Sequence, residues 1–267
     1  MVSDHKHVDF VETGTGPAVL FVPGSFAAPP AWRGVQKMLP QTYRFVATSI
    51  CGYGGTAETR TDDDLDMEHQ FKVLEAVAER IGEPFHLVGH SFGGAISLAS
   101  ALNGTMDILS ITTFEANPLG LIKQGTDTAL FDQTRAMSDA FEAAYFAGEP
   151  DAASRIIDFW GGAGSFASMP EIVLQYCRDK TYNNVLDWRT AYAFDKTAAD
   201  YAALSMPVLL VRGALANRQM VTITNALAAH VPRARSAIVG GASHFLITSH
   251  AKECAKLLGD FLAGING

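Results

Sequence analysis

The chain is poor in cysteine, in basic residues and in charge as a whole, and each shortage excludes a class of protein. Its 3 cysteines, Cys51, Cys177 and Cys254, lie far apart in 267 residues. Such spacing forms neither a disulfide framework nor a zinc-binding pattern, so we expect thiols in a reducing compartment and no metal. The acidic run at residues 62–66 lacks the spacing and the glycine of a calcium loop.

Basic side chains are outnumbered, because 20 lysines and arginines stand against 28 aspartates and glutamates, a formal net charge of −8 at pH 7. Surfaces that bind nucleic acid or an anionic membrane normally carry a basic excess. The first ten residues lack the apolar core of a signal peptide, and the uncharged residues 85–106 contain histidines, glycines and an asparagine that argue against a membrane span. We therefore expect no nucleic acid and no membrane as partners, and a cytoplasmic location.

Apolar residues are plentiful by contrast. The chain is 48% hydrophobic and 18% charged, which allows a sizeable core and excludes global disorder. Its 24 glycines and 11 prolines follow no repeat and are too few for a fibrous protein. The length predicts one large domain, or one domain with an insertion. The oligomeric state stays open, with a homodimer as one possibility.

Short apolar runs alternate with helical patterns over most of the chain. The runs predict strands at residues 7–12, 18–22, 44–50, 85–88, 108–114, 207–212 and 235–239. Helical spacing of apolar residues predicts helices at 67–81, 92–102, 219–230 and 248–263. This alternation is typical of the α/β class, in which helices flank a mostly parallel central sheet on both faces.

The pattern changes between residues 118 and 205, where we expect helices only. These helices are predicted at residues 130–145, 152–160, 169 to about 180, with Pro170 in the first turn, and 183–195. Ser168 and Glu171 have the spacing of a capping box at the start of the third. The sequence thus predicts a core domain of residues 1–117 and 206–267, interrupted by a helical cap at 118–205.

The most informative motif is Gly89-His90-Ser91-Phe92-Gly93, between a predicted strand and a predicted helix. A nucleophile elbow needs this context, because its serine occupies a strained turn and the flanking glycines let two backbones pack closely. The helix that follows also directs positive charge toward a developing oxyanion. We expect Ser91 to be the nucleophile and the Phe92 amide to be an oxyanion donor. The alternative is a glycine-rich turn with a capping serine.

A nucleophilic serine requires a general base, and His244 is the candidate, since its loop follows one predicted strand and precedes the last helix. A surface or capping role is the alternative. Structural roles are expected for His86, His90, His230 and His250. The loop Pro23-Gly24-Ser25 follows an early strand and is placed to supply a second oxyanion donor, the Ser25 amide, unless it is a simple turn.

These residues resemble the α/β-hydrolase family over essentially the whole chain. The elbow GHSFGG, the late GGASHF, the early PGS loop and the segment CGYGGT at residues 51–56 occur in the family's order. The resemblance implies an α/β-hydrolase fold, with the helical cap inserted after the sixth strand. Two departures are present: Pro23 stands where many members have histidine, and the turn at residues 213–217 has no carboxylate where the family's triad acid is usual.

A catalytic histidine needs a partner that fixes its tautomer and stabilises its cation. Glu115 is the nearest replacement for the missing acid, because it ends the strand at residues 108–114 and some family members carry the acid at this strand end. Glu115 could instead be a hinge residue of the cap. In that case His244 would have Asn217 as a neutral partner, or would form a Ser–His dyad with no acid.

The cap is rich in aromatic and poor in cationic side chains, so we expect it to roof an apolar pocket for a small-molecule substrate. Phe26, Trp160 and Trp188 are the candidate lining residues. The sequence predicts a serine hydrolase of a small to medium, largely apolar ester, lactone or thioester, acting through an acyl-enzyme on Ser91. No nicotinamide or flavin fingerprint occurs, so no cofactor is expected.

The same residues narrow the range of further functions. Haloalkane dehalogenase and epoxide hydrolase chemistry are excluded by the resemblance, since those relatives have aspartate at the elbow where this chain has Ser91. A C–C bond hydrolase acting on a diketone-type substrate would use the same residues and stays open. A non-catalytic small-molecule receptor on the same fold also stays open, suggested by the missing carboxylate at Ala216.

Overall fold

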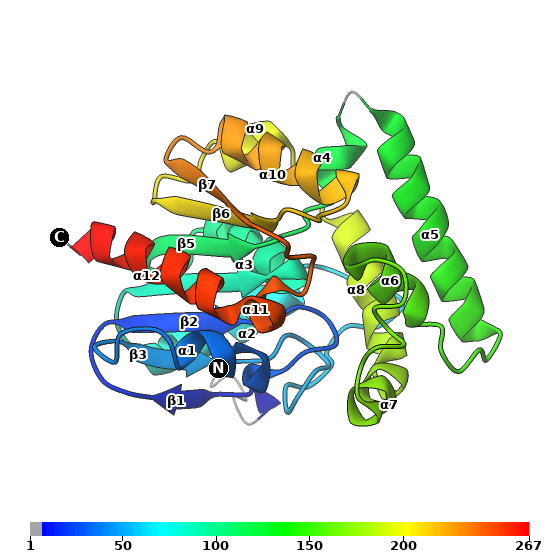
Figure 1. The fold of residues 1–267 in the computed structure, drawn as a ribbon, viewed down its shortest axis with the longest axis horizontal. Helices are drawn as coiled ribbons and strands as arrows, with labels where there is room; N and C mark the ends of the chain where they lie inside the picture. Colours follow the sequence, from blue (N-terminus) through cyan, green and yellow to red (C-terminus); the bar gives the residue numbers. More distant parts are fainter. Residues whose placement is uncertain (1–6, 126, 267) are drawn as a thin grey trace.

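A seven-stranded sheet forms the centre of the computed structural model, which describes residues 7–125 and 127–266 (Figure 1). The strand order is β1-β3-β2-β4-β5-β6-β7, and only the β1–β3 pair is antiparallel. The strands are β1 (Val11–Thr13), β2 (Ala18–Val22), β3 (Arg44–Ala47), β4 (Phe85–His90), β5 (Ile108–Phe114), β6 (Val208–Gly213) and β7 (Ala234–Val239). The predicted α/β fold with a mostly parallel sheet is confirmed.

Helices cover both faces of the sheet (Figure 1). Outside the cap they are the 3-10 helix η2 (Pro29–Trp32), α1 (Arg33–Gln36), α2 (Glu68–Ile81), α3 (Ser91–Asn103), α10 (Arg218–His230), α11 (Leu246–Ser249) and α12 (Ala251–Asn266). Successive side chains of a strand point to opposite faces. In β2, Val19 and Phe21 join a core with α1 and α12, whereas Leu20 and Val22 join a core with α2 and α3. The continuous apolar runs of the sequence arise because both faces are buried.

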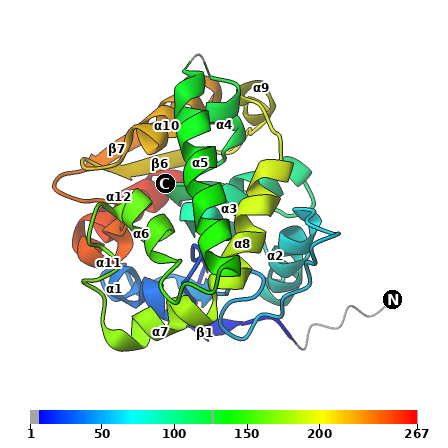
Figure 2. The same cartoon turned by 90° about the vertical axis from the view of Figure 1, so that its right-hand side faces the viewer.

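The segment between β5 and β6 is helical, and most of it, residues 128–193, lies beyond the carboxyl ends of the parallel strands (Figures 1 and 2). Its helices are α4 (Gly120–Lys123), α5 (Thr128–Phe146), α6 (Ser154–Gly161), α7 (Glu171–Asp179), α8 (Thr181–Ala193) and α9 (Ala198–Tyr201). The insertion therefore follows the fifth strand of the described chain, one strand earlier than the resemblance implied, because only β1 to β5 precede it. Pockets in α/β proteins typically form at this end of the sheet.

The capping box expected at Ser168 and Glu171 is wrong. The Ser168 hydroxyl donates to the carbonyl of Ser165 at 2.8 Å, and α7 begins after Pro170, whose side chain makes no cap hydrogen bond. A cap at Ser168 would place a helical residue directly before Pro170, and a proline disfavours helical conformation in the residue that precedes it. The helix therefore starts after the proline.

Two further differences concern the ends of the chain. The single helix expected at residues 248–263 is divided into α11 and α12, because His250 between them departs from helical angles (φ −129°, ψ 42°). Residues 1–6, part of the segment expected to lack a signal peptide, lie outside the described residues. None of the helices in the described ranges combines the length and hydropathy that a bilayer span requires.

Candidate active site

Ser91 lies at a sharp turn between β4 and α3. Its φ of 53° is in the left-handed region, which a residue with a side chain rarely adopts. The turn depends on its glycines. A Cβ at Gly89 would lie 2.6 Å from the carbonyl oxygen of Gly93, and one at Gly93 would collide with the carbonyl groups of Val22 and Pro23. Strand, turn and helix therefore pack closely enough to hold the serine at the end of the sheet, in the geometry expected of a nucleophile elbow.

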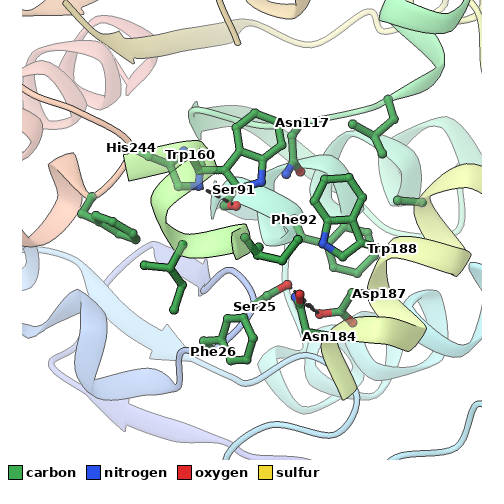
Figure 3. A pocket seen from close by; sticks show the side chains of 15 residues that line it. Ser25, Phe26, Ser91, Phe92, Asn117, Trp160, Asn184, Asp187, Trp188 and His244 are labelled. Atoms are coloured by element: carbon green, nitrogen blue, oxygen red, sulfur yellow. Dashed lines mark hydrogen bonds between the residues drawn. The ribbon is translucent and has the colours of Figure 1, made fainter. Parts of the chain in front are cut away.

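Two hydrogen bonds connect Ser91, His244 and Glu115, which follow three different strands, β4, β7 and β5. The Ser91 hydroxyl lies 2.9 Å from His244 Nε2, and His244 Nδ1 lies 2.8 Å from Glu115 Oε2 (Figure 3 shows the first bond). All three are buried; Ser91 is 8%, His244 3% and Glu115 1% exposed. A carboxylate accepts at Nδ1, so the proton belongs there and Nε2 is left to accept the serine proton. The structure thus brings together the three residues predicted as a triad.

Glu115, and not Asn217, contacts His244. Glu115 directly follows β5 with a φ of 50°, and its second carboxylate oxygen accepts the Gly213 amide of β6 at 2.7 Å. Asn217 instead accepts from the Met220 amide at 2.9 Å, as the N-cap of α10. The Glu115 carboxylate is therefore bound both to His244 and to the end of β6. It takes the place of an acid on the turn after β6.

His90 holds the loop that carries His244. The buried His90 ring lies with Nε2 2.8 Å from the carbonyl oxygen of His244. Burial, together with the nearby His244, lowers the pKa of His90 to about 3, so the ring is neutral and donates from Nε2. His244 also stacks against Trp160 of α6, with ring centroids 5.5 Å apart. The structural role expected of His90 is thus a contact with the proposed base itself.

The candidate oxyanion donors lie on either side of the serine. Phe92 is the second residue of α3, and amides in the first turn of a helix have no intrahelical acceptor. The loop after β2 runs beside Ser91, since a Cβ at Gly24 would lie 2.8 Å from the Ser91 Cβ. That loop continues through Ser25 to Phe26, whose φ of 57° is again left-handed. The segments that carry the two predicted donors therefore lie next to the serine, and the loop that carries Ser25 has a conformation that needs external support.

A cavity lies between the triad and the cap (Figure 3). The volume of the cavity that the centre of a water molecule can reach is about 60 Å³, which is enough for only a few waters. The expected lining residues Phe26, Trp160 and Trp188 all border it, and Trp160 and Trp188 stack on one another. The other apolar lining residues are Phe92, Leu119, Ile156, Ile157, Ala191 and Phe245.

One part of the cavity wall is polar, which the sequence did not reveal. Asp187 of α8 is 3% exposed, and it accepts from the Ser25 hydroxyl at 2.6 Å, from the Tyr53 hydroxyl at 2.7 Å and from Arg60 Nη1 at 2.8 Å. Burial raises the pKa of the Asp187 carboxyl, and the Arg60 guanidinium opposes that rise. Asn117 and Asn184 also border this wall. The interior is therefore less uniformly apolar than the composition of the cap suggested.

These polar residues leave a weak signal in the sequence. Asp187 shares a helical face with Asn184 and Ala191, three residues before it and four after it, and that face borders the cavity. A carboxylate on a helical face that points into the protein indicates that a buried side chain pairs with it. Its partner Arg60, however, is 127 residues away, and no local pattern pairs the two.

Replacing Asp187 by alanine should destabilise the fold. The Arg60 side chain is 0% exposed and, among the described residues, would keep only Glu58 as an ionic partner, while two hydroxyl groups would lose their acceptor. Breaking a buried ion pair costs about 3–5 kcal/mol, so the free energy of unfolding in urea should fall by about 3 kcal/mol or more. The matched control is Asp195→Ala, which removes an exposed ion pair of the cap with Lys123 and should cost under about 1 kcal/mol. Equal losses in both variants would contradict this reading.

Comparisons with known proteins agree with the fold. A family model described as "Alpha/beta hydrolase family" matches residues 19–257. Monoacylglycerol lipase ABHD6 of Rattus norvegicus is 22% identical over 269 residues, covering 95% of this chain and 77% of its own. The 2-hydroxymuconate semialdehyde hydrolase of Pseudomonas sp. (strain CF600) is 24% identical and covers 94% and 89%. Among solved structures, a bromoperoxidase from Bacillus anthracis superposes with a TM-score of 0.76 at 21% identity, covering 96% and 95%.

Proposed function

The chain belongs to the alpha/beta hydrolase family, and on that premise we propose that it is a serine hydrolase of small carboxylic esters, lactones or thioesters. The observation that carries the proposal is the pair of hydrogen bonds from Ser91 through His244 to Glu115 at the wall of a roofed cavity. A free serine hydroxyl is a weak nucleophile, and a neighbouring oriented imidazole is what activates it.

In the first half of the reaction the Ser91 oxygen attacks the acyl carbon, and its proton moves to His244 Nε2. The carbonyl oxygen becomes an oxyanion that accepts hydrogen bonds from the Ser25 and Phe92 amides. His244 then gives the proton to the departing alcohol or thiol, which leaves an acyl group on Ser91. Glu115 stabilises the imidazolium, because a buried carboxylate beside Nδ1 favours the charged ring.

In the second half a water molecule takes the place of the leaving group. His244 Nε2 removes one proton from this water, and the resulting hydroxide attacks the acyl carbon. The same two amides bind the second oxyanion. When this intermediate collapses, His244 returns the proton to Ser91 and the carboxylic acid is released. No step requires a metal or a cofactor.

The size of the cavity favours a short acyl group. On a panel of p-nitrophenyl esters we expect kcat/KM to be highest for acyl chains of about two to four carbons and to fall at least tenfold by about eight carbons, because each methylene that does not fit costs about 1 kcal/mol or more. Initial rates of nitrophenol release measure this profile. Turnover of none of the esters, or a maximum at long chains, would contradict the proposal.

A C–C bond hydrolase is the second candidate, favoured by the likeness to the 2-hydroxymuconate semialdehyde hydrolase. Cleavage of a vinylogous diketone with no ester turnover would select it. The non-catalytic receptor was suggested by the missing acid after β6. Glu115 supplies a carboxylate to His244 from the end of β5, which supports the enzyme over the receptor.

A further inference from the structure

The side chain of Ser25 is bound to the cap, although its backbone amide is the proposed oxyanion donor. The Ser25 hydroxyl donates to Asp187 Oδ2 at 2.6 Å, and Asp187 belongs to helix α8 (dashed in Figure 3). A hydrogen bond from a hydroxyl to a carboxylate is among the shortest and strongest that side chains form. The core therefore supplies the amide, and the cap supplies the group that holds it.

Asp187 is itself held firmly. Tyr53 and Arg60 donate to it from the loop that follows β3, and Arg60 is also bound to Glu58 at 2.7 Å and to the carbonyl of Cys51 at 3.4 Å. The carboxylate thus has fixed partners on the core side, and it cannot move without separating a buried ion pair. A rigid partner of this kind can position another group.

The oxyanion loop needs such a partner. Phe26, next to Ser25, has a φ of 57°, and non-glycine residues in this region persist only where their surroundings hold them. Ser25 has the only polar side chain of residues 23–26, and its hydroxyl is bound to Asp187. Without it, packing alone would fix the direction of the Ser25 amide.

From this arrangement we infer that Asp187 is a positioning residue, which acts through the Ser25 hydroxyl to hold the Ser25 amide at the oxyanion. The cap is then part of the oxyanion hole as well as the roof of the cavity. The inference rests on the proposed serine hydrolase function. It concerns the transition state, because the oxyanion forms only after Ser91 attacks.

Ser25→Ala tests the inference, since it removes the tether and keeps the amide. We expect kcat to fall about ten- to hundredfold on a short p-nitrophenyl ester, the usual result of a small misplacement, with KM changed less than about threefold. A buried serine of α5, Ser138, gives the matched control: Ser138→Ala removes its hydrogen bonds to Arg135 and Tyr192 and should keep wild-type kcat. Wild-type kcat in Ser25→Ala, or a loss confined to KM, would overturn the inference.

A double-mutant cycle with Asp187→Ala separates positioning from general damage. If Asp187 acts through Ser25, the double variant should lose no more kcat than the Asp187→Ala single variant, after normalisation to the fraction of molecules that a fluorophosphonate labels. Losses that multiply would show independent roles and overturn the inference. Failure of the proposed function looks different, because the wild-type protein would then neither take the label nor turn over the ester.

Discussion

Replacing Ser91 by alanine should lower kcat for ester hydrolysis about a millionfold, leaving only the residual catalysis that substrate binding and the oxyanion donors provide. The reason is geometric. The Ser91 oxygen is the hydroxyl 2.9 Å from His244 Nε2, and without it the imidazole has no nucleophile to activate. The Ser91→Ala protein should unfold at nearly the wild-type temperature, because the left-handed turn is formed by the backbone and its glycines.

Ser100→Ala is the matched control for this variant. Ser100 is a buried serine of the same helix, α3, and its hydroxyl has no partner within the part of the chain that the structure describes. Its removal should leave kcat within about twofold of wild type and should not lower stability by more than a few tenths of a kcal/mol. If Ser91→Ala kept more than about one per cent of wild-type kcat, Ser91 would not be the nucleophile.

Replacing Glu115 by glutamine should lower kcat about ten thousandfold with KM little changed. The amide has nearly the shape of the carboxylate, but its nitrogen is a donor. A donor at 2.8 Å from His244 Nδ1 would move the ring proton to Nε2, which could then no longer accept the proton of Ser91. The same substitution also removes the charge that stabilises the imidazolium.

Asn217→Ala distinguishes the candidates for the third member of the triad. Asn217 caps α10 through the Met220 amide and donates to the Phe159 carbonyl at 3.1 Å, but it does not contact His244. Its loss should therefore cost about 1–2 kcal/mol of stability and leave kcat within about threefold of wild type. The reverse result, a large kcat loss in Asn217→Ala and a small one in Glu115→Gln, would assign the role to Asn217. Small losses in both would indicate a Ser–His dyad.

The sequence predicted those parts of the molecule that depend on local chemistry. The run at residues 18–22 became β2 without change, because a strand buried on both faces needs no polar residue. Ser91 was recognised because its turn requires glycines at fixed neighbouring positions. Glu115 was predicted as the triad acid because a histidine base needs a partner and the turn at residues 213–217 has no carboxylate. In each case a few adjacent residues carry the information.

The remaining features depend on distant partners. The bond from His90 to the carbonyl of His244 spans 154 residues, and it forms only because β4 and the loop after β7 end at the same edge of the sheet. Asp187 and Arg60 likewise meet only once the cap lies over the core. The prediction at Ser168 was wrong because the spacing of a capping box does not include the effect of Pro170 on the residue before it.

The mass of the protein after reaction with a fluorophosphonate tests the central claim most directly. The account predicts one phosphonyl group per molecule, located by peptide mapping on Ser91, with the labelling rate greatly reduced in His244→Ala because Ser91 then has no base. A label on another residue, or no label on folded wild-type protein, would contradict the account.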